Sequence, residues 1–225
     1  MSDRVKTTRS YDSPRRREQA AATRHQILEA AQRLFERQGY AATTMAAIAA
    51  EAGVALKTVY VAFETKSGLL RALWHLLLRG DQEDVPVADR RWYQEVLEEP
   101  DPDRLLRLTA RNSRAVKERA GALMGVIRSA ASTDADIADL WARIQADFHD
   151  NQRGIVKALH TRKALRPGLG VARAADVLWT LNHPDLWLLL VGERGWTPGE
   201  WERWFTDVAR SQLLVRASTP RRTVQ

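Results

Sequence analysis

The sequence predicts an all-α protein, and three observations support that fold class. Along most of the 225 residues, apolar side chains recur at the three- and four-residue spacing that marks one face of a helix. No segment shows the sustained apolar–polar alternation of a half-buried strand. Glycine and proline residues separate the periodic stretches. We therefore expect a series of helices joined by short loops.

The N-terminal part is expected to begin with a basic arm. Residues 1–17 carry almost no apolar side chains, which is typical of a flexible segment. Helical spacing starts shortly afterwards and predicts a helix that begins between residues 18 and 23. Gly39 is expected to end this helix as a left-handed cap residue.

Three further helices are expected before residue 80. Thr43 and Thr44 offer N-cap hydroxyls to a short helix, which Gly53 ends. Another short helix is expected over residues 56–63, and a fourth follows it and ends at Gly80. We place the boundary between two domains on this fourth helix or just beyond it, near residue 80.

The rest of the chain also has the helical pattern. After an acidic loop and a short helical piece at residues 89–98, amphipathic helices are expected over residues 103–119, 120–131, 134–164, 171–191 and 198–215. Thr133 is the expected cap of the third of these helices. Pro184 should kink or restart the fourth, with Asn182 or His183 as the new cap. The expected organisation is therefore a basic arm, two helical domains and a basic tail, over residues 1–17, 18–80, 81–215 and 216–225.

Composition excludes several kinds of site. The chain has no cysteine, which rules out disulfides, thiolate metal sites and cysteine nucleophiles. No apolar stretch approaches the roughly 18 residues that span a bilayer, and the basic N-terminus lacks the apolar segment of a secretory signal. We expect a cytoplasmic protein that has no membrane partner and needs no metal or other cofactor.

The net charge of +7 favours a polyanionic partner, because basic groups attract phosphates over long range. Basic side chains outnumber acidic ones among residues 1–24, which include Arg15, Arg16, Arg17 and Arg24. A solvated tail that aids solubility would explain this cluster equally well. The segment that follows it decides between the two interpretations.

Residues 43–66 have the plan of a helix-turn-helix. Two short helices are joined by a tight turn at Gly53, and small alanines on the first helix permit close packing. In this plan the second helix enters a DNA major groove about 12 Å wide.

The segment from Arg24 to Leu70 resembles the DNA-binding domain of the TetR family of regulators. The matching residues are Ile27-Leu28-Glu29-Ala30-Ala31, Leu34-Phe35, Gly39-Tyr40, Thr43-Thr44, Ile48-Ala49, Ala52-Gly53-Val54, Thr58-Val59-Tyr60, Phe63, Lys66 and Leu69-Leu70. The resemblance implies an N-terminal three-helix helix-turn-helix DNA-binding domain and a C-terminal helical domain for effector binding and dimerisation.

The resemblance also implies which side chains meet DNA. Tyr60 and Lys66 match positions that hold the DNA backbone in this family, and Thr58 matches the base-reading start of the recognition helix. Thr44 stands at a helix N-terminus, which favours a phosphate, and Arg15–Arg17 could reach phosphates or a minor groove. The expected DNA-binding set is Thr44, Ala55, Lys57, Thr58, Tyr60, Lys66 and Arg24. Tyr60 also fits a plain packing residue, and Thr44 a simple helix cap.

Some positions depart from the family pattern. Ala55 stands where a serine is frequent, and Val61 and Ala62 replace larger polar residues. These changes remove hydrogen-bonding groups from the recognition helix. Lys57 is then the best candidate for a guanine contact, while Val61 and Ala62 are limited to thymine methyl groups.

The last two helices carry more apolar side chains than a single buried stripe needs. In the TetR family these helices pair with those of a second subunit, so the resemblance implies a homodimer that binds a palindromic operator. The expected interface residues are Leu178, Leu186, Leu189, Trp204, Phe205 and Val208. Burial of these side chains within one subunit is the alternative.

The middle helices are expected to form the pocket for a small-molecule effector. The candidate pocket residues are Asn112, Met124, Trp141, Phe148, His149, Trp179 and His183. Each of them also fits an ordinary core or surface position. The arginine and tryptophan content suits an aromatic or acidic ligand.

The leading hypothesis is a sequence-specific transcriptional regulator, a repressor that a small-molecule effector releases from its double-stranded operator by population shift. A ligand-independent or activating regulator is the alternative, and a non-specific nucleoid protein would need basic charge over its whole surface. An enzyme is not expected, because the sequence has no phosphate-binding glycine loop, nucleophile elbow or metal-ligand spacing.

Overall fold

The computed structural model describes residues 14–79 and 86–215, which form the all-helical fold that the sequence predicts. They fall into two compact units that divide between Ala72 and Leu73, inside helix α4 (Lys66–Arg79). The boundary placed near residue 80 lies just beyond this helix and stays a prediction. The expected tail at residues 216–225 lies outside the described residues.

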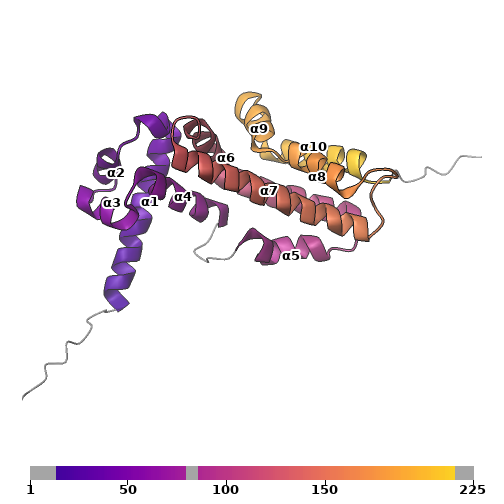
Figure 1. Ribbon diagram of the computed structural model, residues 1–225, viewed down its shortest axis with the longest axis horizontal. Coiled ribbons are helices and arrows are strands. Elements are labelled where there is room, and N and C mark those ends of the chain that lie inside the picture. The colour runs from indigo at the N-terminus through magenta and orange to yellow at the C-terminus, as the bar shows by residue number, and fades with distance from the viewer. Residues whose placement is uncertain (1–13, 80–85, 216–225) are drawn as a thin grey trace, which may run out of the picture. The chain divides into compact units, whose positions relative to one another are not determined.

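The first unit contains α1 (Pro14–Ala42), α2 (Met45–Glu51), α3 (Leu56–Phe63) and the beginning of α4 (Figure 1). Helix α1 begins at Pro14, so the expected arm is wrong for residues 14–17, because a proline in the first turn costs no helical hydrogen bond. The arm's first 13 residues lie outside the described part of the chain.

Gly39 interrupts α1 as the sequence predicts, with a φ of 78° and a ψ of 174°. The positive φ confirms a glycine-dependent break, although this ψ belongs to an extended conformation and not to a left-handed cap. The chain then turns so that Tyr40 stacks on Phe35, with ring centroids 5.8 Å apart. Ile27, Phe35, Ile48 and Leu69 are fully buried in this unit, as their helical spacing indicates.

The second unit is built from helices around one apolar core (Figure 1). Its longest helices are α6 (Pro102–Ala130) and α7 (Ala135–Thr161). Helix α8 (Val171–Leu181) packs along α7, and α10 (Pro198–Leu213) packs along both α6 and α8. Helix α5 (Arg91–Glu98), which follows the 3-10 turn η1 (Val87–Asp89), contacts α6 and α7 from the other side.

Three aromatic rings anchor the core of this unit. Trp201 is fully buried, and its ring lies edge-on to Trp187 and stacked on Phe205, each at a centroid distance of 5.2 Å. Helix α6 is one continuous helix, where two segments at residues 103–119 and 120–131 were expected. A Cβ at Gly121, inside α6, would lie 3.2 Å from the Trp187 Nε1, so this glycine makes room for the indole instead of ending the helix.

Polar side chains cap the starts of two helices in this unit, α7 and α10. Asp134 caps α7 by accepting a hydrogen bond from the Ile137 amide at 3.2 Å. The cap predicted at Thr133 is wrong, because the Thr133 hydroxyl donates backwards to the Ala130 carbonyl at 3.1 Å. Thr197, directly before Pro198, caps α10 and forms a capping box with Glu200.

Pro184 restarts the helix after α8, as the sequence predicts. The short α9 (Pro184–Trp187) begins there, and the π-helical segment η2 (Leu188–Glu193) follows it. His183 is the N-cap, and its Nδ1 accepts a hydrogen bond from the Asp185 amide at 3.3 Å. The cap that remained open between Asn182 and His183 is therefore His183.

Within residues 14–79 and 86–215, the only β-type pairing is an isolated antiparallel bridge between Leu165 and Leu214. In the same residues, no single helix has both the length and the apolar character to span a membrane. Helices α2 and α3 together meet these criteria of length and composition, but they are bent by 113° at their junction.

Candidate nucleic-acid interface and ligand cavity

The helix-turn-helix in the first unit has the geometry that its sequence predicts. The bend of 113° between α2 and α3 lies within the range of known helix-turn-helix pairs. Gly53 in the connecting turn has a φ of 66°, a left-handed conformation that glycine adopts without steric cost. Met45, Ile48 and Ala49 are buried on the inner side of α2, which fixes the position of α3 against it.

Thr44 is the N-cap of α2. Its Oγ1 accepts a hydrogen bond from the Ala47 amide at 3.1 Å, which confirms the cap that the sequence predicts. The side chain is exposed, and the first turn of α2 carries no acidic residue. The helix N-terminus therefore favours an anion, and a phosphate contact at Thr44 stays a prediction.

Helix α3 turns one side to the core and the other to solvent. Val59 and Phe63 are buried, and Thr58 is half-buried beside them. The exposed side carries Ala55, Leu56, Lys57, Tyr60 and Val61. Tyr60 is 48% exposed and Val61 is 76% exposed, so both side chains are accessible to a partner. This exposed side is the surface where the sequence places base and phosphate contacts.

Arg24 holds α3 against α1 in the structure, and its DNA contact stays a prediction. Its Nη1 donates to the Ala62 carbonyl at 2.7 Å, in the last turn of α3. The guanidinium also lies over the Phe63 ring, 4.2 Å from the centroid. Both contacts place the positive charge at the negative end of the recognition helix.

Lys66 is also engaged within its own unit. Its Nζ donates to the Tyr40 carbonyl at 2.8 Å and to the Thr43 carbonyl at 3.0 Å. The same ammonium lies 4.1 Å from the centroid of the Tyr40 ring. The side chain thus fixes the segment between α1 and α2, and its DNA contact stays a prediction. Arg15, Arg16 and Arg17 are exposed along the first turns of α1.

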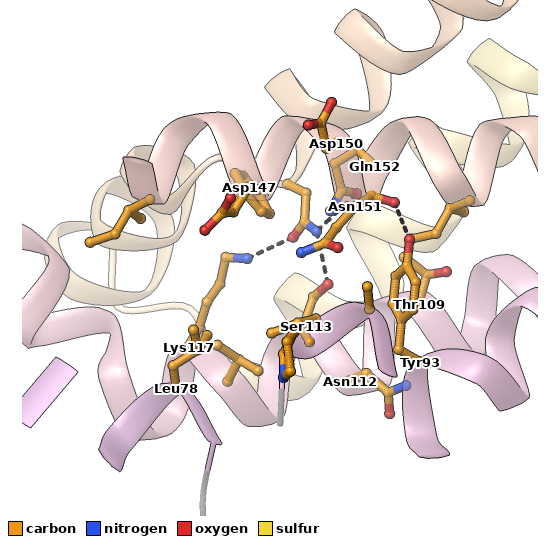
Figure 2. Close-up of a pocket in the computed structure, with 18 of the residues that line it drawn as sticks. Leu78, Tyr93, Thr109, Asn112, Ser113, Lys117, Asp147, Asp150, Asn151 and Gln152 are labelled. Carbon is orange, nitrogen blue, oxygen red and sulfur yellow. Dashed lines mark hydrogen bonds between the residues drawn. The ribbon is translucent and has the colours of Figure 1, made fainter. Parts of the chain in front are cut away.

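The second unit encloses a cavity of about 650 Å³, a size that suits a drug-like molecule. Its walls are mainly aromatic and aliphatic side chains, including Trp74, Leu78, Trp92, Tyr93, Val96, Val116, Met124, Ile144, Phe148 and Ile155. Tyr93 donates its hydroxyl to the Asn151 carbonyl at 2.6 Å (Figure 2). Burial raises the pKa of this phenol to about 12, so Tyr93 remains a neutral donor.

A polar cluster from α6, α7 and the end of α8 interrupts the apolar wall (Figure 2). Lys117 Nζ donates to Asn182 Oδ1 at 2.6 Å. Asn182 Nδ2 in turn donates to Ser113 Oγ at 2.9 Å and to Gln152 Oε1 at 3.3 Å. Lys117, Asn182 and Gln152 are all buried, so this cluster is a fixed part of the cavity and not a solvated surface group.

Lys117 is the most perturbed side chain of the cluster. It is 4% exposed, and its Nζ lies 4.8 Å from the centroid of the Trp201 ring. Burial lowers the pKa of Lys117 to about 7, because the charged form loses its hydration. A lysine with both protonation states near neutral pH therefore lines the cavity.

The structure brings together some of the pocket residues expected from the sequence. Asn112, Met124 and Phe148 line the cavity, and Asn112 Nδ2 donates to the Trp92 carbonyl at 3.1 Å. The others lie outside its lining: Trp141, His149, Trp179 and His183. His149, Trp179 and His183 instead form a row of ring contacts, with centroids 6.3 Å and 4.9 Å apart.

The expected interface residues also separate into two groups. Leu178 and Phe205 are fully buried in the core of one chain, so they have no surface to offer a partner. Leu189 is 46% exposed, and Leu186, Trp204 and Val208 are partly buried. Only this second group is available for an interface.

Sequence reasoning missed Lys117, Ser113 and Gln152 as cavity residues. A signal was present, because Lys117 shares the helical spacing of buried Ala120 and Met124 on α6. Asn182 was considered only as a helix cap. In the described part of the chain, no group of three or more histidine and acidic side chains is arranged to hold a metal ion.

Comparisons with known proteins agree on one family. Residues 27–73 match the model of the family described as bacterial regulatory proteins, tetR family. The probable HTH-type transcriptional regulator ArpR of Pseudomonas putida is 30% identical over 184 residues, which cover 78% of this chain and 85% of that protein.

Solved structures share the fold. The crystal structure of NalD, the secondary repressor of the MexAB-OprM multidrug efflux pump in Pseudomonas aeruginosa, superposes with a TM-score of 0.68 at 20% identity and covers 89% of this chain and 100% of that one. The SmeT–triclosan complex superposes with a TM-score of 0.67 at 21% identity and covers 87% of this chain and 93% of that one.

Proposed function

Because the chain belongs to the TetR family of bacterial regulatory proteins, we propose that it is a repressor that leaves its operator when a small molecule fills the cavity of the second unit. One observation carries this proposal. The chain combines a helix-turn-helix with an exposed recognition helix in one unit and a largely apolar cavity of about 650 Å³ in the other.

The exposed side of α3 is the proposed DNA-reading surface. Lys57 supplies a donor for a guanine edge in the major groove, and Tyr60 supplies a hydroxyl for a backbone phosphate. Leu56 and Val61 offer apolar contacts to thymine methyl groups. Arg24 and Lys66 stabilise the position of this surface by donating hydrogen bonds to the carbonyls of Ala62 and Tyr40.

A homodimer is proposed to present two copies of this surface to a palindromic operator. Its interface would use Leu186, Leu189, Trp204 and Val208, which are exposed or partly exposed near the C-terminal end of the chain. Light scattering should give twice the chain mass of 25.5 kDa, and a strict monomer would contradict the dimer.

Helix α4 is the proposed link between ligand and DNA. Its second half contributes Trp74, His75 and Leu78 to the cavity wall, while its first half belongs to the helix-turn-helix unit. A ligand that shifts the second half of a continuous helix also changes the position of the first half. The SmeT–triclosan complex, a relative in fold, supports the idea that a small molecule binds within this architecture.

DNA binding is tested with a duplex that spans the region upstream of the chain's own coding sequence. Lys57→Ala should weaken binding by about 1–3 kcal/mol and relax specificity, since it removes a base contact. Tyr60→Phe should weaken binding to specific and random duplexes alike, because a phosphate carries no sequence information. Lys157→Ala is the matched control, because Lys157 is an exposed lysine on α7 in the other unit.

Two results would contradict the proposal. Equal losses for Lys57→Ala and Lys157→Ala would mean that α3 does not read DNA. If the wild-type protein shows no preference for the upstream duplex over random DNA, the chain is not a sequence-specific regulator.

Release from the operator is measured as the loss of fluorescence anisotropy of the labelled duplex in the presence of candidate effectors. A compound that binds the protein without changing its DNA affinity would favour a ligand-independent regulator.

A further inference from the structure

The ammonium group of Lys117 is only partly hydrogen-bonded by the cavity wall. A protonated lysine has three N–H donors, and the structure gives one of them an acceptor, Asn182 Oδ1 at 2.6 Å. Its other close neighbours are aromatic faces, Trp201 at 4.8 Å and Phe148 at 5.9 Å from their centroids. Two donors therefore remain for a further acceptor.

The polar residues around Lys117 are neutral, and their hydrogen bonds fix their orientation. Asn182 turns its carbonyl oxygen toward the lysine because its amide nitrogen donates to Ser113 and Gln152. The arrangement presents oxygen to the cation, and among the described residues no carboxylate forms an ion pair with Lys117. A buried cation normally has a charged partner, since the loss of hydration is otherwise costly.

Carboxylates do line the cavity, but they are solvated. Asp147 and Asp150 on α7 are exposed side chains, whereas Lys117 is 4% exposed. Figure 2 shows the Lys117 amine directed toward the amide cluster. An acidic group on a ligand would reach an ammonium that the protein's own acids leave unpaired.

We infer that the cavity takes an aromatic, mainly apolar small molecule with one acidic group, and that this group docks on Lys117 while the rings fill the apolar wall. The inference rests on the proposed function of the cavity and adds the class of ligand. The aromatic side chains Trp74, Trp92 and Phe148 provide surfaces for stacking. Two charge-assisted hydrogen bonds to the ammonium provide the selectivity for an acid.

Two fluorescent probes test the charge requirement directly. 1-Anilinonaphthalene-8-sulfonate and N-phenyl-1-naphthylamine share one aromatic scaffold, and only the first carries an acidic group. The wild-type protein should bind the sulfonate at least about tenfold more tightly, as expected for a charged hydrogen bond in a buried site. Lys117→Met should remove this preference and leave the affinity for the neutral probe unchanged or higher.

Controls separate the site from general effects. Lys157→Met removes an exposed lysine from α7 and should keep the preference of the wild-type protein. Binding of the neutral probe by Lys117→Met shows that the variant still forms the cavity. Lys117→Gln, which keeps a donor but no charge, should behave like the methionine variant.

Several outcomes would overturn the inference. These are equal binding of the two probes by the wild-type protein, sulfonate affinity that survives Lys117→Met, and failure of both probes to bind. The proposed function is judged separately by operator release. A neutral compound that releases the operator would uphold the proposed function while the preference for acids fails.

Discussion

Replacement of Lys117 should change how the stability of the protein depends on pH. In the folded protein burial lowers the pKa of Lys117 to about 7, whereas the pKa of a hydrated lysine side chain is about 10.5. Between these values the unfolded chain holds the proton and the folded protein has released it. Because the unfolded state then binds more protons, the free energy of unfolding rises with pH across this window.

The magnitude follows from the two pKa values. One pH unit inside the window is worth about 1.4 kcal/mol for a single group. Near pH 7 the folded group is still half protonated, so the gain between pH 7 and pH 9 is about 2 kcal/mol. Below pH 7 both states are protonated and this contribution becomes flat. Lys117→Met removes the titrating group and should remove the gain.

The assay is urea unfolding at pH 7 and pH 9, followed by tryptophan fluorescence at one fixed protein concentration. Titrations of groups that do not interact with Lys117 cancel when the variant is subtracted from the wild-type protein. Lys157→Met should show no such difference, because Lys157 is exposed. A difference between wild-type and Lys117→Met that is the same at both pH values would refute the burial argument.

Other variants test single contacts. Gly121→Ala should destabilise the second unit by about 1–3 kcal/mol, because its Cβ would press on the Trp187 indole. Gly125→Ala on the same helix should be neutral or stabilising, since its Cβ would make only ordinary van der Waals contact. Equal melting temperatures for the two variants would contradict this packing. Gly39→Ala should cost about 1–3 kcal/mol through backbone strain alone, since its φ is 78° and nothing lies within 4 Å of the new Cβ, and calorimetry that shows no loss would exclude the strain. Arg24→Gln should lower the melting temperature as well as the DNA affinity, because it removes a contact that holds α3. A loss of DNA affinity with an unchanged melting temperature would instead indicate that Arg24 contacts a phosphate directly.

Local signals made the fold of the first unit predictable. Gly39, Thr44 and Gly53 each determine the backbone within a few residues of themselves, and the structure has a break, a cap and a left-handed turn at those places. On each helix, the three- and four-residue spacing of apolar side chains predicted the buried face without knowledge of the partner helix. Ile27 and Phe35 on α1 and Leu69 on α4 are examples, and all three are fully buried. These signals depend on chemistry within about one turn of helix.

The cavity depends on contacts between residues far apart in the chain, which periodicity does not encode. Lys117 meets Asn182 across α6 and the end of α8, and neither residue alone indicates that contact. Thr133 and Asp134 are neighbours that both suit a cap, and only the fold decides that Asp134 takes this position. Leu178 and Leu189 have similar hydrophobicity, yet one is fully buried and the other is 46% exposed.

The hydrogen bonds of Lys66 within its own chain have a consequence for how operator occupancy responds to ionic strength. Each cation that neutralises a phosphate releases condensed counterions, so binding weakens with salt by a slope of about −0.9 per phosphate contact. Lys66 donates to two carbonyls of its own chain, so it should release fewer counterions than a fully hydrated lysine when the chain binds DNA. Operator binding should therefore fall less steeply with salt than the net charge of +7 suggests, and a shift in the salt content of the cell would change repression correspondingly little.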